Sequence, residues 1–124
     1  MLGIVLVAAD PERVVVAMPV TADHENFLGA THGGAIFSVA DCALSLASNA
    51  SATAVAIDAH LALTAATHRG DTLTATAEPV TRGRTIATYR IIVTRDDGRT
   101  CGLFTGTVAI TGSGTPANTD KAPT

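Results

Sequence analysis

The sequence predicts an α+β domain in which one long helix packs on a five- to six-stranded antiparallel sheet. Three observations support this fold class. One segment near residue 40 is rich in Ala and Leu, four runs after residue 50 have β character, and the last two connections are short turns that contain glycine. Short connections of this kind join antiparallel neighbours. The expected order is two strands, one helix and four strands, which is a helix layer on a sheet layer.

Length and composition indicate one domain with a substantial core. The chain has 124 residues, of which 47% are hydrophobic and 15% charged, so it is too apolar for a disordered protein. Its formal net charge is −3, Lys121 is the only lysine, and basic residues do not cluster, which excludes nucleic acid as a partner. The apolar run Leu2–Ala9 is too short to span a bilayer and follows no basic residue. We therefore expect no membrane span, no signal peptide and a cytoplasmic protein.

The first two expected strands form a hairpin. Runs rich in β-branched residues cover Gly3–Ala8 and Arg13–Val20, and the Ala9–Glu12 segment between them has turn chemistry with proline in a permitted position. From Thr21 to Thr31 the pattern is lost and polar residues precede a glycine, so we expect a loop there.

A helix is expected over Ala35–Asn49, which is rich in Ala and Leu. Thr31 is the candidate N-cap, and Asn49 stands near the C-terminal end. Hydrophobic residues occur on nearly every side of this segment, so we expect the helix to be buried on most sides. Four strands follow, over Ala54–Leu63, Asp71–Thr81, Arg84–Arg95 and Arg99–Ile110.

Two tight turns join the last three strands. Thr81–Arg84 and Asp96–Arg99 each contain a glycine, where we expect a positive φ. Residues 1–111 form the single predicted domain. Residues 112–124 are rich in Gly, Ser, Thr and Pro without a pattern, and they are predicted to form a disordered C-terminal tail.

The cysteines and histidines indicate neither a disulfide nor a metal site. Cys42 and Cys101 form no C-x-x-C pair and are interpreted as small buried hydrophobes in a reducing compartment. Metal ligands need a recognisable spacing. His24, His60 and His68 lack it, both among themselves and with the cysteines. No metal and no redox cofactor is therefore expected.

Asp41 is the most informative residue in the sequence. It is the only charged residue between Glu25 and Asp58, and its neighbours in the expected helix are apolar. A carboxylate in such surroundings is costly unless partners offset its desolvation or it takes up a proton. Capping or ion pairing at a helix surface is one interpretation, although the helix offers no evident polar face. A functional role is the other, because perturbed carboxylates cluster at functional sites.

Gly33 and Gly34 stand just before the expected helix. Backbone N–H groups at a helix start lack intrahelical partners and the helix dipole is positive there, so such a site binds anions or polarises a carbonyl oxygen. A glycine pair at a loop-to-helix junction also occurs for backbone accommodation alone. No Gly-Lys-Ser/Thr sequence follows, which excludes a phosphate loop.

The stretch from Asn26 to Asp41 resembles a family signature. It reads Asn-x-x-Gly-x-x-His-Gly-Gly followed by an Asp in the helix, as in hotdog-fold acyl-CoA thioesterases of the PaaI (phenylacetate-degradation) type. The similarity extends more loosely through Ile57-Asp58, Gly70–Leu73, the Arg-Gly-Arg turn and Phe104–Thr107. The resemblance implies the hotdog fold, an acyl-CoA substrate and thioester hydrolysis.

The resemblance also implies residue roles. Asp41 would be the catalytic carboxylate, acting as general base or nucleophile, and the Gly33 backbone N–H would donate to the thioester carbonyl. Asn26 would position the water or the leaving group, and His32 would shape the loop and orient Asn26. The residues agree with this mechanism, since thioester hydrolysis needs a carboxylate and donors aimed at the developing oxyanion.

The predicted substrate-binding residues are Gly34, Phe37, Ser45, Arg82 and Arg84. A position that carries serine in some relatives is Ala56 here, so Ser45, one turn beyond Asp41, is the candidate hydroxyl. Arg82 and Arg84 are either solvated turn residues or contacts to a coenzyme A phosphate. The acyl pocket is expected to be lined by small and aliphatic side chains and to take an aryl-acetyl or medium-chain acyl group. Coenzyme A would enter only as part of the substrate.

Three other functions are compatible with the fold. A non-catalytic acyl-CoA-binding module would keep the pocket and not need Asp41. A thioesterase acting on acyl carrier protein would use the same chemistry on another carrier. A hydratase would need a His and an acid paired across the site in a different loop context, and no such pair lies near Gly33.

The active site is predicted to be shared between two subunits of a dimer or tetramer. Gly33 and Asp41 are eight residues apart, which places them about 12 Å apart along one helix axis. Both must reach the same thioester, within roughly 5 to 7 Å of each other. Two antiparallel helices about a two-fold axis near Phe37 satisfy this requirement, because Asp41 of one faces Gly33 of the other.

Overall fold

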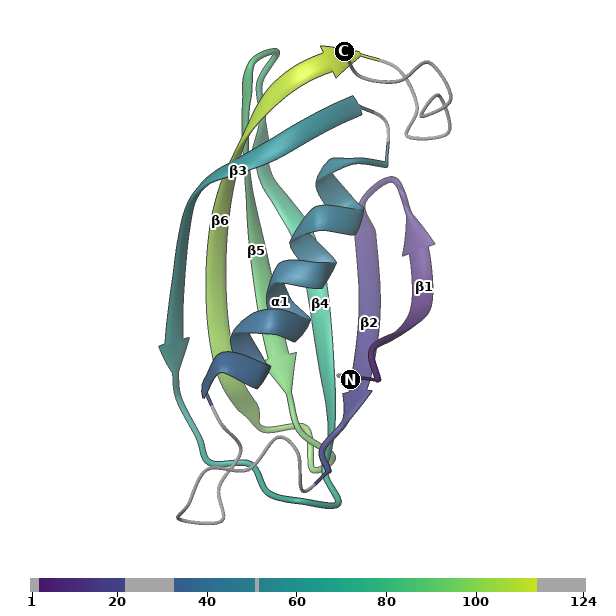
Figure 1. The fold of residues 1–124 in the computed structure, drawn as a ribbon, viewed down its shortest axis with the longest axis vertical. Coiled ribbons are helices and arrows are strands. Elements are labelled where there is room, and N and C mark those ends of the chain that lie inside the picture. The colour runs from purple at the N-terminus through teal and green to yellow at the C-terminus, as the bar shows by residue number, and fades with distance from the viewer. Residues whose placement is uncertain (1–2, 22–32, 51, 114–124) are drawn as a thin grey trace.

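A six-stranded antiparallel sheet curves around one helix in the computed structural model, which describes residues 3–21, 33–50 and 52–113 (Figure 1). The elements in chain order are β1 (Val5–Asp10), β2 (Arg13–Pro19), α1 (Gly33–Ser48), β3 (Ala52–Leu63), β4 (Thr72–Arg82), β5 (Ile86–Thr94) and β6 (Thr100–Ser113). The predicted α+β class and the order of elements are confirmed.

The helix carries the chain from one side of the sheet to the other. The strand order is β1-β2-β4-β5-β6-β3, and every neighbouring pair is antiparallel. β1 and β3 are therefore the two edge strands, and α1 lies across the face between them (Figure 1). Short connections pair β4 with β5 and β5 with β6, as the two glycine turns predicted.

Several boundaries differ from the predictions. β6 continues to Ser113, beyond the predicted domain end at residue 111, because Gly112 and Ser113 pair with Thr53 and Ala52 at the start of β3. The helix begins at Gly33, two residues earlier than expected. The rest of the predicted tail and the candidate N-cap Thr31 lie outside the described residues.

The two turn glycines serve different purposes. Gly98 has a φ of 84°, as predicted. Gly83 has no positive φ, so that prediction is wrong. Its N–H donates to the carbonyl of Ile86 at 2.8 Å, and a Cβ at this position would lie 2.8 Å from the same oxygen. Glycine is needed there for close approach of the backbone.

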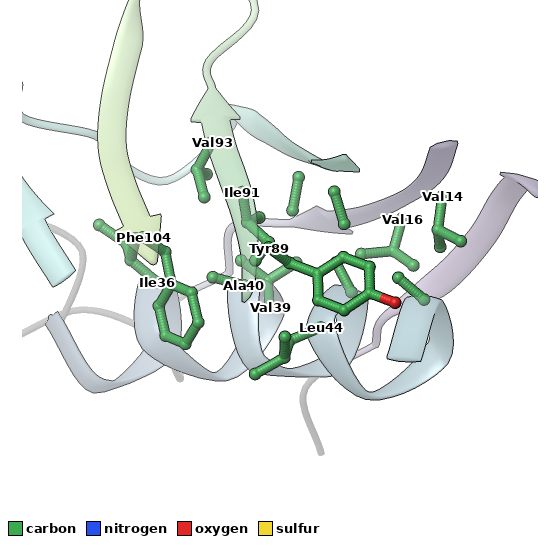
Figure 2. Close-up of a cluster of buried hydrophobic side chains, with 14 of the residues drawn as sticks. Val14, Val16, Ile36, Val39, Ala40, Leu44, Tyr89, Ile91, Val93 and Phe104 are labelled. Carbon is green, nitrogen blue, oxygen red and sulfur yellow. The ribbon is translucent and has the colours of Figure 1, made fainter. Parts of the chain in front are cut away.

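The core lies between one face of α1 and alternate residues of the sheet (Figure 2). The buried helix residues recur at helical spacing: Ala35, Ile36, Val39, Ala40, Ala43, Leu44, Ala47 and Ser48. Burial is confined to this face within one subunit, so a single subunit does not bury the helix on most sides. The opposite face is half-buried or exposed.

Helix and sheet approach closely at Gly106 of β6. A Cβ built on this glycine would lie 2.6 Å from Cδ2 of Leu44 and 3.0 Å from Cε1 of Phe104. Leu44 and Phe104 are both almost fully buried, so neither side chain has free space to move into. The position of α1 above β6 therefore depends on a residue without a side chain.

Candidate active site

The outer face of α1 carries a stripe of polar side chains. Ser38, Asp41, Ser45 and Asn49 follow one another at intervals of three or four residues, so they share one side of the helix. Sequence reasoning found no polar face, although the spacing was present in the sequence. Asp41 is therefore half-buried beside polar neighbours within the subunit, and the predicted wholly apolar setting is wrong.

Asp41 lines a small cavity between the helix and the β3 side of the sheet. The cavity has a volume of ≈110 Å³, is open to solvent, and is lined by Asp41, Leu44, Ser45, Ser48, Asn49, Ala54, Ala56 and Val108. Ser45, the candidate hydroxyl, thus shares a cavity with Asp41. The carboxylate makes no hydrogen bond or ion pair with any residue that the structure describes, which leaves its oxygens available to a ligand or a water.

Asn49 fixes the far wall of this cavity. Its backbone N–H and its Nδ2 both donate to the carbonyl of Ser45, at 3.1 and 2.9 Å. Its Oδ1 accepts the N–H of Ala54 in β3 at 2.9 Å. These bonds close the helix C-terminus and hold the start of β3 beside Asp41. This role of Asn49 was not predicted, because its partner in β3 cannot be identified from helix pattern alone.

Gly33 lies at the other end of the helix. It packs against β3 near its last residue, since a Cβ on Gly33 would lie 3.3 Å from Cδ1 of Leu63. As the first residue of α1 it presents a backbone N–H without an intrahelical acceptor. Eight residues of helix separate Gly33 from Asp41, about 12 Å along the axis. One subunit therefore does not bring these two groups together.

Phe37 lies between them on the same side of the helix. Its ring meets the ring of Phe104 edge-on, with centroids 5.2 Å apart and an interplanar angle of 67°. Phe37 is nevertheless 37% exposed to solvent. Phe37 thus offers an aromatic surface one turn from Asp41 and one turn from Gly33, and its part in substrate binding stays a prediction.

Neither of the two predicted arginines lines the Asp41 cavity. Arg82 donates through Nη1 to Glu12 at 3.2 Å and through Nη2 to the carbonyl of Pro11. Its Nε donates to the Tyr89 hydroxyl at 3.5 Å, and this bond contributes most to the raised pKa of Arg82. Arg82 thereby ties β4 to the β1–β2 turn. Arg84 is exposed and forms no ion pair with the part of the chain described.

Cys42, next to Asp41, is half-buried on the outer side of the helix. The pKa of the Cys42 thiol is raised, first by burial and second by the neighbouring Asp41 carboxylate. A negative charge beside a thiol disfavours the thiolate. This thiol therefore reports on the charge of Asp41.

Two predicted catalytic residues, Asn26 and His32, lie outside the described residues. Their roles remain predictions. Among residues 3–21, 33–50 and 52–113, no three His, Cys, Asp or Glu side chains gather as metal ligands would. The single helix in this part of the chain is not long and apolar enough to cross a bilayer.

Comparisons with known proteins identify the family of the chain. A model of the thioesterase superfamily matches residues 28–102. The chain is 37% identical over 106 residues to acyl-coenzyme A thioesterase PaaI of Escherichia coli, covering 85% of this chain and 76% of that protein.

Solved structures give the same result. The E. coli PaaI protein of the phenylacetic acid degradation operon superimposes with a TM-score of 0.88 and 35% identity, covering 92% of this chain and 83% of the other. A Streptococcus mutans protein, smu.793, bound to acetyl CoA, gives a TM-score of 0.83 and 25% identity, covering 90% and 91%.

The fold and these similarities thus define a hotdog-fold thioester hydrolase. The chain belongs to the thioesterase superfamily and is of the PaaI type.

Proposed function

We propose that the chain hydrolyses an acyl-CoA to the free acid and coenzyme A, with Asp41 as the catalytic carboxylate. The observation that carries the proposal is the Asp41 carboxylate, which faces a cavity and has no partner in the described part of the chain. The likeness to acyl-coenzyme A thioesterase PaaI supports the substrate class, as does the S. mutans structure bound to acetyl CoA.

Asp41 has two chemical routes to this reaction. As a general base it takes a proton from water while the hydroxide adds to the thioester carbonyl, and the Gly33 N–H donates to the oxyanion. Collapse of the intermediate breaks the C–S bond, and the proton passes to the coenzyme A thiolate. As a nucleophile, the carboxylate instead displaces the thiolate and forms an anhydride that water then cleaves.

Both routes require Asp41 and Gly33 to reach one thioester. Because about 12 Å of helix separates them within a subunit, we place Asp41 of one subunit opposite Gly33 of a second. Asn26 and His32 would join the site with Gly33, positioning the water or leaving group and ordering the loop. Two equivalent sites then form in each dimer.

The walls of the site suit an apolar acyl group. Leu44, Ala54, Ala56 and Val108 form the apolar part of the Asp41 cavity, and Phe37, one turn from Asp41 on the helix, is 37% exposed. We propose an aryl-acetyl or medium-chain acyl group. Arg84, exposed and without an ion pair in the described residues, is the better placed arginine for a coenzyme A phosphate, because Arg82 is held by Glu12 and Pro11. The two free cysteines support a reducing, cytoplasmic location.

A panel of thioesters tests the activity. Acetyl-, hexanoyl-, octanoyl-, phenylacetyl- and succinyl-CoA, together with an octanoyl acyl carrier protein, are compared by release of free thiol. We expect hydrolysis of the apolar coenzyme A thioesters. Preference for succinyl-CoA would contradict the apolar pocket, and preference for the carrier protein would change the substrate class. Binding of acyl-CoA without thiol release would favour a non-catalytic module.

Mixed dimers test the shared site. An Asp41→Asn chain is mixed with an Asn26→Ala, Gly33→Pro chain, each inactive alone, and subunit exchange is confirmed by mass. One of the two sites in each mixed dimer is then intact, so about one quarter of wild-type activity should return at equal mixing. Mixing Asp41→Asn with Asp41→Ala is the matched control and should restore nothing. No recovery in the first mixture would show that each subunit has its own site.

A further inference from the structure

The sheet continues past the C-terminal end of α1 (Figure 1). The helix has 16 residues and β6 has 14, which correspond to about 24 Å of helix and about 48 Å of strand. The helix ends at Ser48, whereas β6 continues to Ser113, where it pairs with the start of β3. At this end, α1 therefore leaves part of the helix-side face of the sheet uncovered.

A second cavity lies at this end of the sheet. It has a volume of ≈170 Å³ and is lined by Ser48, Ala52, Arg82, Gly83, Ala87, Tyr89, Val108 and Ile110. Ala87 is opposite Val108 in the sheet and both are buried, so they lie on the helix side. The aliphatic side chains of the second cavity are those of Ala52, Ala87, Val108 and Ile110.

The second cavity adjoins the Asp41 cavity. The two cavities share Ser48 and Val108 among their lining residues. The helix residues that line the Asp41 cavity are Asp41 itself and residues that follow it in the chain, up to Asn49. The Asp41 cavity therefore runs from the carboxylate toward the C-terminal end of α1, which is the direction of the second cavity.

The polar side chains between the two cavities are bonded to one another. The Ser48 hydroxyl donates to the carbonyl of Ser45 and accepts Nδ2 of Asn49, each at 3.4 Å. Nδ2 of Asn49 also donates to the Ser45 carbonyl, and its Oδ1 accepts the N–H of Ala54. Polar groups whose hydrogen bonds are already made can lie beside an apolar chain without the cost of an unmade bond.

The second cavity also has a polar part, on residues that do not line the Asp41 cavity. Tyr89 is 4% exposed, and its hydroxyl accepts Nε of Arg82 at 3.5 Å. Arg82 is held in turn by Glu12 and by the carbonyl of Pro11. A methyl group pressed against this guanidinium would remove its water, which costs free energy. Arg82 therefore limits how far an apolar chain extends from Asp41.

The distance from Asp41 to the second cavity matches a medium-length acyl chain. Asp41 and Ser48 are seven residues apart in α1, which is about 10 Å along the axis. An extended alkyl chain advances about 1.3 Å per carbon, because its C–C bonds are about 1.5 Å long. About eight carbons thus lead from a carbonyl at Asp41 to Ser48. A hexanoyl group stays within the Asp41 cavity, whereas a decanoyl group ends in the second cavity.

We infer that the second cavity is a distal acyl site, which takes the last carbons of a linear acyl chain of about 8 to 12 carbons whose thioester lies at Asp41. Ala87 and Ile110 set the length that the site accepts. This inference rests on the proposed function and specifies its substrate class, because a linear chain reaches the distal acyl site and an aryl-acetyl group ends before it.

Ala87→Leu tests the distal acyl site by filling it. Ala87 is 2% exposed, and the cavity beside it has space for a larger side chain. The ratio of kcat/KM for decanoyl-CoA to that for hexanoyl-CoA should fall by about tenfold, because about two methylenes lose their burial. Ala109→Leu is the matched control. Ala109 follows Val108 in β6 and so projects from the opposite face of the sheet, and this variant should leave the ratio unchanged.

Ile110→Ala tests the same site in the opposite direction. Ile110 is partly buried against the core and lines the second cavity. Truncating it enlarges the distal acyl site, so the ratio of kcat/KM for dodecanoyl-CoA to that for decanoyl-CoA should rise by about threefold. Circular dichroism shows which variants are folded, and Ile110→Ala decides the question if Ala87→Leu is not. An unchanged ratio in either folded variant would overturn the distal acyl site.

Binding of thioethers separates this inference from the proposed function. Hexyl-CoA and decyl-CoA have no thioester carbonyl and cannot be hydrolysed, and calorimetry on the full chain gives their dissociation constants. Decyl-CoA should bind to wild type about tenfold more tightly than hexyl-CoA or better, and Ala87→Leu should reduce this advantage to about threefold or less.

Two further outcomes are decisive. Equal binding of the two thioethers to wild type, or an advantage of decyl-CoA that Ala87→Leu keeps in full, would overturn the distal acyl site. It would leave the proposed hydrolysis standing if thiol is released from hexanoyl-CoA. The expected binding pattern without thiol release from any thioester would support the distal acyl site and overturn the proposed hydrolysis.

Discussion

The two faces of α1 differ in burial and in the kinds of side chain they carry. The inner face consists of small and aliphatic residues buried against the sheet, with Ile36, Val39 and Leu44 nearly free of solvent contact. The outer face carries Phe37, Asp41, Cys42 and other side chains that stay partly exposed. The inner face is complete within one subunit. The outer face carries the proposed catalytic carboxylate of Asp41 and the exposed part of the Phe37 ring.

Under the proposed function, this difference separates stability from activity along a single helix. A change on the inner face removes packing contacts and should lower the free energy of unfolding with an indirect effect on catalysis. A change on the outer face removes a reacting group and should lower the rate with little effect on folding. Variants at adjacent helix positions can therefore break the two properties one at a time.

The largest effect is expected for Asp41→Asn on the outer face. Asn cannot accept a proton from water or attack a carbonyl, so kcat should fall by about 10³-fold. The free energy of unfolding should stay within about 0.5 kcal/mol of wild type, since the carboxylate has no partner in the described residues.

Asp96→Asn is the matched control for this substitution. It removes the same charge from an exposed turn, where the Oδ1 accepts the N–H of Thr72 at 3.1 Å. It should leave kcat unchanged. Retention of near-full activity in a folded Asp41→Asn protein would remove Asp41 from the mechanism.

On the inner face, Leu44→Ala should lower the free energy of unfolding, and because Leu44 also lines the Asp41 cavity we use it as a test of stability alone. Leu44 is 1% exposed and fills the space above Gly106. Truncating a buried leucine usually costs about 2 to 5 kcal/mol of unfolding free energy. Denaturant unfolding measures this loss. A cost below about 1 kcal/mol would mean that helix and sheet are not packed as closely as the structure indicates.

Gly106→Ala is expected to have a smaller effect of the same kind. The added methyl would meet Leu44 and Phe104 at 2.6 to 3.0 Å, and overpacking of this sort costs about 1 to 3 kcal/mol. In a Leu44→Ala background both contacts with Leu44 are gone and the contact with Phe104 at 3.0 Å remains, so the cost of Gly106→Ala should be smaller than in wild type. Additive costs in the double variant would place the strain elsewhere.

The contrast between the two faces of α1 also shows which features could be predicted from the sequence. Local patterns gave the element order, the antiparallel turns and the helix that carries Asp41, because periodicity and turn chemistry act over a few residues. The polar stripe through Ser38 and Asn49 was readable at helical spacing, yet the high Ala and Leu content hid it. The same Ala and Leu content predicted a buried helix face, but one wider than the face that a single subunit buries.

Long-range pairings were not predictable in the same way. Arg82 bonds to Glu12 seventy residues away, and Asn49 accepts a bond from the start of β3. Such partners follow from the order of the strands in the sheet, which local sequence patterns do not determine. The place of β3 at the far edge, which exposes its outer side, also emerges only from the topology.

The smallest expected effect concerns the charge of Asp41 as read by its neighbour. Burial and the Asp41 carboxylate both raise the pKa of the Cys42 thiol. Asp41→Asn removes the second cause, so the pKa should fall but stay above its ordinary value because of burial. The rate of Cys42 alkylation by iodoacetamide, followed by mass against pH, measures this shift. The profile of Asp41→Asn should lie at lower pH than that of wild type, while Ser45→Ala, one turn away and uncharged, should leave it in place. Superimposable profiles for wild type and Asp41→Asn would mean that the Asp41 carboxylate does not act on this thiol. The side chains on the outer face of α1 would then be arranged differently from those described above.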